Sequence, residues 1–405
     1  MHPVRILVGV AVTAMLAGAA CAQSTTATGV SRASNPAISV NTLLLGRVAD
    51  EATANEYNGI RIQEAEVQLT SIVDPYWKAN LVFAVHPEHG HDHAEDGAEA
   101  EADGHDHGTR YVGDVEVAYV EGTALPYRLG LRVGKDYLPF GKHVPLHTHQ
   151  FPFVDAPVAV KTFLGDHGLT EIGARLSRDL PLPWYSDLTA YAVDGKAEIF
   201  DAESRDLAFG ARWTHLVDLG TESTLELGGS WLHGPQAHGY LAGEHAHEDH
   251  DDALYPDLDV LGADVTFKWV SASRSKGPAL NVTGEVILPS SDTIEGDPFG
   301  WYAFAQYRFA RSWWLGVGVG GLDLDREMHE DEHEHEEEEH AHEHAHLFAW
   351  DEVFESKVNL TWAPSEFSAL RLEAAHYDDQ QGDADDWLIS LQANFTIGSH
   401  PAHSY

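Results

Sequence analysis

The sequence predicts an all-β protein, an antiparallel transmembrane barrel of about sixteen strands like those of bacterial outer membranes. Segments of mostly 10 to 13 residues alternate between apolar and polar side chains, as strands with one lipid-facing side do. The gaps between these segments are alternately long and short. Beyond the N-terminal region, no run reaches the roughly 18 apolar residues of a membrane-spanning helix. A soluble β-sandwich or β-helix is the alternative, but sandwich strands usually have only about 5 to 6 residues.

The alternation is clearest near the C-terminus, in segment 387–397. One face carries Trp387, Ile389, Leu391, Ala393, Phe395 and Ile397, and the other carries Leu388, Ser390, Gln392, Asn394 and Thr396. Four further segments group their apolar residues in the same way: Leu129, Leu131 and Val133; Val358, Leu360 and Trp362; Val115, Val117 and Tyr119; and Val265, Phe267 and Trp269. We expect these faces to contact lipid and the opposite faces to line the interior.

Sixteen such segments follow one another, although the pattern leaves counts of 14 or 18 open. They are 38–47, 60–71, 76–86, 111–121, 127–137, 168–178, 184–194, 206–216, 221–233, 258–270, 278–289, 299–310, 312–323, 350–362, 367–378 and 386–397. Long or variable gaps follow the odd-numbered segments and tight gaps follow the even-numbered ones, which predicts long extracellular loops and short periplasmic turns. An even number also lets the first segment pair with the last, because lipid does not tolerate an open sheet edge.

The N-terminus has the features of a secretory signal. Arg5 precedes an apolar run, and Ala20-Cys21-Ala22 is a small-x-small cleavage site. Lipid attachment at Cys21 is the alternative. Cleavage after Ala22 removes the only cysteine, which excludes disulfides, cysteine zinc sites and thiol nucleophiles from the mature chain.

Three domains are therefore expected: a signal peptide at 1–22, an N-terminal periplasmic segment at 23–37, and the barrel at 38–405. The localisation that follows is the bacterial outer membrane, with its lipid and lipopolysaccharide as partners. Either the terminal Tyr405 or the strand residue Phe395 is expected to be the recognition signal for the barrel-assembly machinery.

The net charge of −41 argues against nucleic acid as a partner. Windows 86–110, 233–257 and 324–349 together hold 25 of the 65 acidic residues and 18 of the 27 histidines. The run 329–346 has no apolar residue larger than alanine, so it cannot bury a face and should be solvated. Each window follows an odd-numbered segment, so we expect all three to be extracellular loops.

The chemistry of these loops favours transition-metal binding. Neutral imidazole is the commonest protein ligand of zinc, copper and nickel, and His-x-His spacing with carboxylates between gives several exchangeable sites. The alternative is solvated acidic loops that bridge calcium or magnesium to lipopolysaccharide, for which carboxylates alone suffice. No cofactor is required, and zinc, copper or nickel would be a bound or transported ion. The candidate ligands are His86, His89, His91, His93, His105, His107, His245, His247, His250, His329, His333, His335, His340, His342, His344 and His346.

The stretch Gly134-Lys-Asp-Tyr-Leu-Pro-Phe-Gly141 and the return Gly168-Leu-Thr-Glu-Ile-Gly173 are similar to outer-membrane porins of the phosphate-selective and siderophore-porin type, with most similarity to a His-loop subgroup linked to zinc. The resemblance implies a trimeric or monomeric channel in which loop 138–167 folds inward and narrows the pore. The candidate constriction residues are His143, His147, His149 and Asp155. Lys142 and Lys161 are the only lysines of this loop, which argues against an oxyanion channel.

The sequence predicts no enzyme. It has no His-Glu-x-x-His helix and no Gly-x-Ser-x-Gly elbow, and four glutamates expected to face inward are explained by lumen lining: Glu64, Glu66, Glu116 and Glu226. We therefore expect an outer-membrane channel whose external loops bind zinc or a similar divalent metal and favour its uptake. The alternatives are a general or anion-type porin with metal-buffering loops, or a soluble periplasmic zinc-binding protein.

Overall fold

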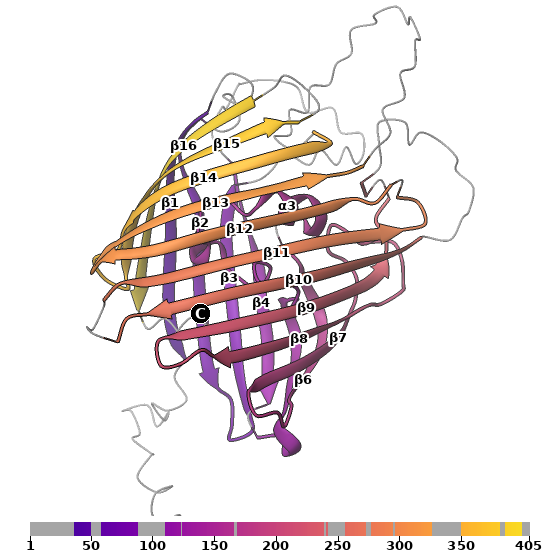
Figure 1. The fold of residues 1–405 in the computed structure, drawn as a ribbon. Coiled ribbons are helices and arrows are strands. Elements are labelled where there is room, and N and C mark those ends of the chain that lie inside the picture. Colours follow the sequence, from indigo (N-terminus) through magenta and orange to yellow (C-terminus); the bar gives the residue numbers. More distant parts are fainter. Residues whose placement is uncertain are drawn as a thin grey trace, which may run out of the picture.

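In the computed structural model the described residues form one closed antiparallel barrel (Figure 1). They are 36–49, 58–87, 110–122, 124–165, 168–238, 240–241, 256–272, 277–294, 296–325, 350–380 and 385–398. The strands are β1 (Ala37–Ala49), β2 (Gly59–Ile72), β3 (Trp77–Pro87), β4 (Tyr111–Gly122), β5 (Leu129–Tyr137), β6 (Thr170–Asp179), β7 (Tyr185–Val193), β8 (Ala208–Asp218), β9 (Ser223–Pro235), β10 (Asp257–Val270), β11 (Ala279–Ser291), β12 (Phe299–Ala310), β13 (Trp313–Asp323), β14 (Glu352–Trp362), β15 (Ser368–Asp379) and β16 (Asp385–Gly398). The predicted count of sixteen is confirmed.

Closure of the barrel follows the predicted pairing of the first and last strands. β1 runs antiparallel to β16, from Ser39 opposite Gly398 to Ala49 opposite Leu388. Each remaining strand pairs with its neighbours in chain order. The barrel therefore has no open edge, as lipid requires.

The outer surface is apolar along most strands, as alternation predicts. On β16, Trp387, Ile389 and Leu391 are about half exposed, whereas Ser390 and Gln392 face inward and are buried. A soluble protein would not leave a continuous apolar surface open to water, but a hydrocarbon environment favours it. Among the described residues, no helix is long and apolar enough to cross a membrane.

One predicted face is wrong. Val115, Val117 and Tyr119 were expected to contact lipid together, but only Val115 is exposed, while Val117 is 1% exposed and packs inside with Tyr119. The register between β3 and β4 shifts at Val82/Phe83, which leaves Glu116 as an extra residue in β4. This β-bulge reverses the alternation, so the second half of the strand presents the opposite set of side chains.

Some predicted boundaries also need small corrections. β1 begins at Ala37, so the N-terminal segment 23–37 overlaps the barrel by one residue. His86 still belongs to β3 and His233 to β9, so loops 86–110 and 233–257 begin later than expected. The predicted signal peptide 1–22 lies outside the described residues.

The segment between β5 and β6 fills part of the interior. It contains the short 3-10 helix η3 (Thr148–Gln150) and the helix α3 (Val158–Leu164), while a second 3-10 turn, η2 (Pro126–Arg128), precedes β5. Figure 1 shows α3 within the outline of the barrel. Its Phe163 and Leu164 are fully buried and belong to one apolar cluster with wall residues such as Ile287. This packing places the loop against the inner wall.

We expect Leu391→Arg to destabilise the barrel by about 2 to 4 kcal/mol, because the charge would lie near mid-height on the lipid-facing surface. Leu391 is 55% exposed and pairs with Gly46 of β1. The measurement is the urea midpoint of the protein in lipid vesicles, followed by tryptophan fluorescence. The control is Glu366→Arg in the exposed turn before β15, which should leave the midpoint unchanged. Equal midpoints in the two variants would contradict a lipid-facing Leu391.

Candidate functional site

The loop from β5 enters the barrel through the Pro-Phe-Gly turn. Gly141 has a φ of +57°, in the left-handed region. Its amide donates to Ser230 Oγ at 3.0 Å, and the amide of Lys142 donates to Glu285 Oε2 at 2.8 Å. A Cβ at position 141 would overlap the Glu285 carboxylate. The turn therefore requires glycine for both its conformation and its close approach to the wall.

Two further carboxylates of the wall hold the loop by its backbone. Both oxygens of Glu373 on β15 accept the amide of Val154, at 3.1 and 3.0 Å. Glu355 on β14 accepts the amide of Val158 at 3.2 Å. Buried amides need acceptors, and charged acceptors make stronger hydrogen bonds than neutral ones. These glutamates therefore serve to fix the loop in the lumen.

Asp155, one of the predicted constriction residues, anchors the same loop to β1. Its Oδ2 lies 2.5 Å from Arg47 Nη2. Burial would raise the pKa of Asp155, but the positive charges of Arg47, Lys161 and Lys357 hold it below its usual value. Lys357 also donates to the carbonyl of Ala156, at 3.3 Å. Asp155 thus carries its charge and ties the loop to the wall.

His143 is a neutral packing residue. It is 3% exposed, and its ring centroid lies 4.3 Å from that of Phe151 and 6.2 Å from that of Tyr302. Burial, with Lys357 nearby, lowers the pKa of His143 to about 3. The ring is therefore uncharged at neutral pH. It packs on aromatic rings, whereas the other two loop histidines contact carboxylates.

His147 and His149 face carboxylates on strands β2 and β4 of the barrel wall. His147 Nδ1 lies 3.1 Å from Glu116 Oε2 and 3.5 Å from Glu66 Oε1, and His149 Nδ1 lies 3.2 Å from the same Glu66 oxygen. Burial lowers the pKa of His147, but its contacts with Glu116 and Glu66 outweigh burial and raise the pKa well above its ordinary value. Two imidazoles from the loop and two carboxylates from the wall therefore meet at one place.

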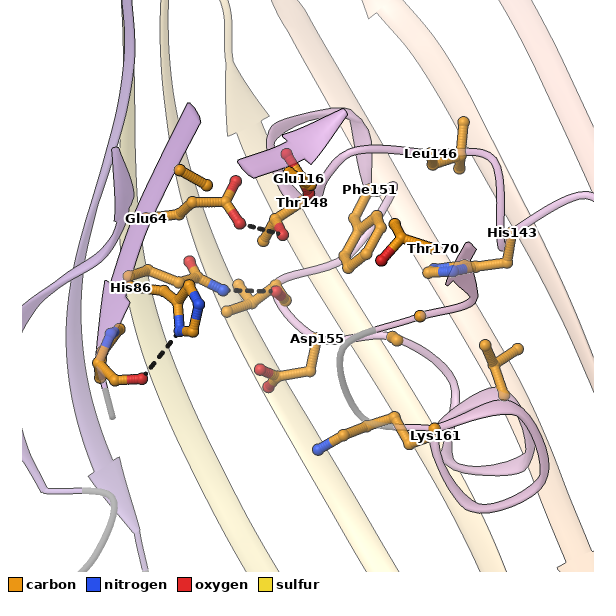
Figure 2. Close-up of a pocket in the computed structure, with 18 of the residues that line it drawn as sticks. Glu64, His86, Glu116, His143, Leu146, Thr148, Phe151, Asp155, Lys161 and Thr170 are labelled. Atoms are coloured by element: carbon orange, nitrogen blue, oxygen red, sulfur yellow. Dashed lines mark hydrogen bonds between the residues drawn. The ribbon is translucent and has the colours of Figure 1, made fainter. Parts of the chain in front are cut away.

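A third carboxylate, Glu64, completes this cluster. Its Oε2 accepts a hydrogen bond from Thr148 Oγ1 at 2.8 Å, which Figure 2 marks with a dashed line. The hydroxyl of Tyr137 donates to Glu116 Oε1. We call Glu64, Glu66, Glu116, His147 and His149 the lumenal cluster. Two sets of its members, Glu64, Glu66 and His149 and also Glu66, Glu116 and His147, place one ligand atom each within 4.8 Å of one another.

The loop separates two cavities. The outer cavity, about 700 Å³, reaches His86 and Asp114 at the barrel end that carries the predicted long loops. The inner cavity, about 380 Å³, reaches Lys268 near the short-turn end. His143 and Leu146 line both cavities, so the loop between them is the partition.

Of the sixteen predicted metal ligands only His86 is among the described residues. Its Nδ1 lies 3.0 Å from the carbonyl of Pro87, and its Nε2 lies 3.7 Å from Asp114 Oδ1. It lines the outer cavity. The others lie outside the described residues: His89, His91, His93, His105, His107, His245, His247, His250, His329, His333, His335, His340, His342, His344 and His346.

Sequence reasoning placed Glu64, Glu66 and Glu116 inside the barrel but did not include them in a site. The available signal was Glu64-Ala-Glu66, two acids on one face of a strand. The contact of Glu66 with His149 joins positions 83 residues apart in the chain, and that of Glu116 with His147 joins positions 31 apart, which no local pattern reveals.

Comparison with known proteins supports the fold. No family model matches the chain. An uncharacterized protein of Aquifex aeolicus is 24% identical over 375 residues, which cover 87% of this chain and 71% of that protein. An anion-selective porin from Comamonas acidovorans has a TM-score of 0.54 at 9% identity, covering 90% of this chain and all of that one. The outer membrane channel DcaP of Acinetobacter baumannii has a TM-score of 0.51 at 11% identity, covering 93% of this chain and all of that one.

These similarities agree with the closed barrel and its apolar exterior. The chain is a sixteen-strand β-barrel of the outer-membrane type, with the fold of the porins.

We expect Gly141→Ala to lower the free energy of unfolding by about 1 to 3 kcal/mol, because the new side chain collides with Glu285 in a left-handed conformation. The measurement is the urea midpoint, with limited proteolysis of loop 138–167 in detergent as a second readout. Gly229→Ala is the control, since a Cβ there meets nothing within 4 Å. If Gly141→Ala matches Gly229→Ala in both measurements, the turn does not anchor the loop.

Proposed function

We propose that the protein is a passive outer-membrane channel whose external histidine- and acid-rich loops gather zinc, or a similar divalent metal ion, and favour its uptake. Loop 138–167 narrows the path. The observation that carries the proposal is the loop fixed across the lumen with a cavity on each side. A path that connects these cavities must pass the loop, so ions and small solutes would be selected there.

The external loops add the metal specificity. The three windows hold 18 of the 27 histidines, and His86, where the first of them begins, lies at the outer cavity. Ions held by exchangeable imidazole sites at the rim would be concentrated at the pore entrance, which raises their rate of entry without an energy source. This composition also motivates placement in the zinc-linked subgroup of these porins.

An anion-type porin is less well supported, because several cationic side chains of the lumen are paired with carboxylates. These pairs include Lys142 with Glu226, Arg212 with Asp264, and Lys357 with Glu355, at 2.7 to 2.8 Å. A paired cation attracts a passing anion less than an isolated one does. The soluble periplasmic alternative requires a polar exterior, which the apolar outer face of the barrel does not provide.

A channel needs no catalytic group, and the buried glutamates that contact loop 138–167 bind its backbone amides, its histidines or Thr148. The expected partners are the barrel-assembly machinery and the lipopolysaccharide-containing membrane. The assembled form would be a homotrimer or a monomer.

Planar-bilayer recording tests the channel function. We expect the refolded protein to open stable ion-conducting pores, and micromolar zinc on the long-loop side to change their current. A protein that inserts without conducting would contradict the proposal. Conductance that zinc leaves unchanged, together with no metal phenotype in cells, would favour the general porin.

Removal of residues 329–346 should lower cell-bound zinc and slow growth under chelation, because the run contains seven histidines. Cell-bound zinc is measured by elemental analysis. A matched variant keeps the acids and replaces those seven histidines by glutamine. If the glutamine variant binds as much zinc as the unmodified protein, carboxylates rather than imidazoles hold the metal and the proposed role of these histidines fails.

A further inference from the structure

The lumenal cluster has the ligand spacing of a metal site. In tetrahedral zinc sites, ligand atoms lie about 2.0 to 2.2 Å from the ion and hence roughly 3.3 to 3.6 Å from one another. The three contacts of His147 and His149 with Glu66 and Glu116 are 3.1, 3.2 and 3.5 Å. An ion could thus enter with small adjustments of side chains already in place.

Two β-bulges bring the wall residues to this place. The β1–β2 register shifts at Leu43/Leu44, which leaves Gln63 as an extra residue directly before Glu64. The shift between β3 and β4 does the same at Glu116. Bulges redirect side chains, and they are frequent beside functional sites. Both irregularities lie in strands that supply carboxylates to the cluster.

The cluster also has an acceptor that the protein leaves unused. Glu64 is 8% exposed, and its Oε1 is buried without a hydrogen-bond partner among the described residues. Glu64 and Glu66 each supply a ligand atom within 4.8 Å of the other and of one on His149. Carboxylates buried this close together repel each other unless the positive charge of a proton or a metal cation lies between them. A divalent cation would supply that charge and use the free oxygen.

From these observations we propose that Glu64, Glu66, Glu116, His147 and His149 form a binding site for a divalent transition-metal ion inside the lumen. Nitrogen and oxygen ligands together suit zinc, copper or nickel, whereas calcium and magnesium prefer oxygen alone. Thr148 on Glu64 and Tyr137 on Glu116 orient two of the ligands, as outer partners do in metal sites.

The position of the site gives it a role in permeation. Glu64 and Glu116 line the outer cavity, His149 lines the inner cavity, and Glu66 belongs to both three-ligand sets. An ion could enter from the outer cavity past Glu64 and Glu116, exchange ligands around Glu66, and leave past His149 into the inner cavity. This role rests on the proposed channel function, whereas metal binding itself does not.

The test is zinc block of single-channel current, with zinc chloride added on the short-turn side, away from the external loops. We expect micromolar zinc to cause brief, voltage-dependent blocks of the unmodified channel. Glu66→Gln and the double variant His147→Ala/His149→Ala should need at least about tenfold more zinc for half-block, since loss of one ligand exceeds the effect of an outer partner. His376→Ala is the control, because that ring packs on Trp387 away from the cluster and should leave the block unchanged.

Folding of each variant is checked by its heat-modifiable mobility on gels. Unblocked current in the unmodified channel, or equal block in all variants, overturns the site while the channel function stands.

If the protein does not conduct at all, zinc binding by equilibrium dialysis replaces the recording. Loss of one bound ion in Glu66→Gln, relative to His376→Ala, then supports the site, and equal binding overturns it. Should the double variant not fold, Glu66→Gln alone decides, as an isosteric change.

Discussion

Pairing of β1 with β16 governs the architecture of the whole barrel. In hydrocarbon every backbone N–H and C=O must find a partner within the protein, and only a closed sheet provides one for each strand. Closure also creates an interior that lipid does not reach. The inward positions can therefore be as polar as the outer ones are apolar, and Ser390 and Gln392 alternate with Ile389 and Leu391 for this reason.

The lumen then has its own requirement for hydrogen-bond partners. A loop that folds inside carries backbone amides away from bulk water, and buried amides without acceptors are costly. Glu285, Glu355 and Glu373 meet that need from one side of the wall. Glu64 and Glu66 differ because they face the imidazoles and a hydroxyl of the loop instead of its backbone. Buried glutamates of the wall thus have two roles: some bind backbone amides of the loop, and others bind its side chains.

Loop 138–167 is both anchored to the barrel wall and the segment proposed to select ions. Its anchors come from β1, β11, β14 and β15, so its position is set by strands far apart in the chain. These anchors hold the loop along one arc of the wall, from β11 to β1, and so can keep side chains such as His147 in a fixed place within the lumen. Rigid placement is what separates a defined ion site from the exchangeable sites expected of solvated histidine-rich loops.

The amino-acid sequence was enough to predict a barrel of about sixteen strands, most of their lipid-facing sides and the pairing of the chain ends, because these follow from period-2 alternation and from closure. The resemblance of the motif ending at Gly141 to porins also implied an inward loop that carries Asp155 and the three loop histidines. The inward position of Val117 and the contacts of Glu66 with His147 and His149 become visible only in the folded chain. A bulge depends on the register with a neighbouring strand, and the cluster depends on how a long loop crosses the lumen, so neither is encoded in a local pattern.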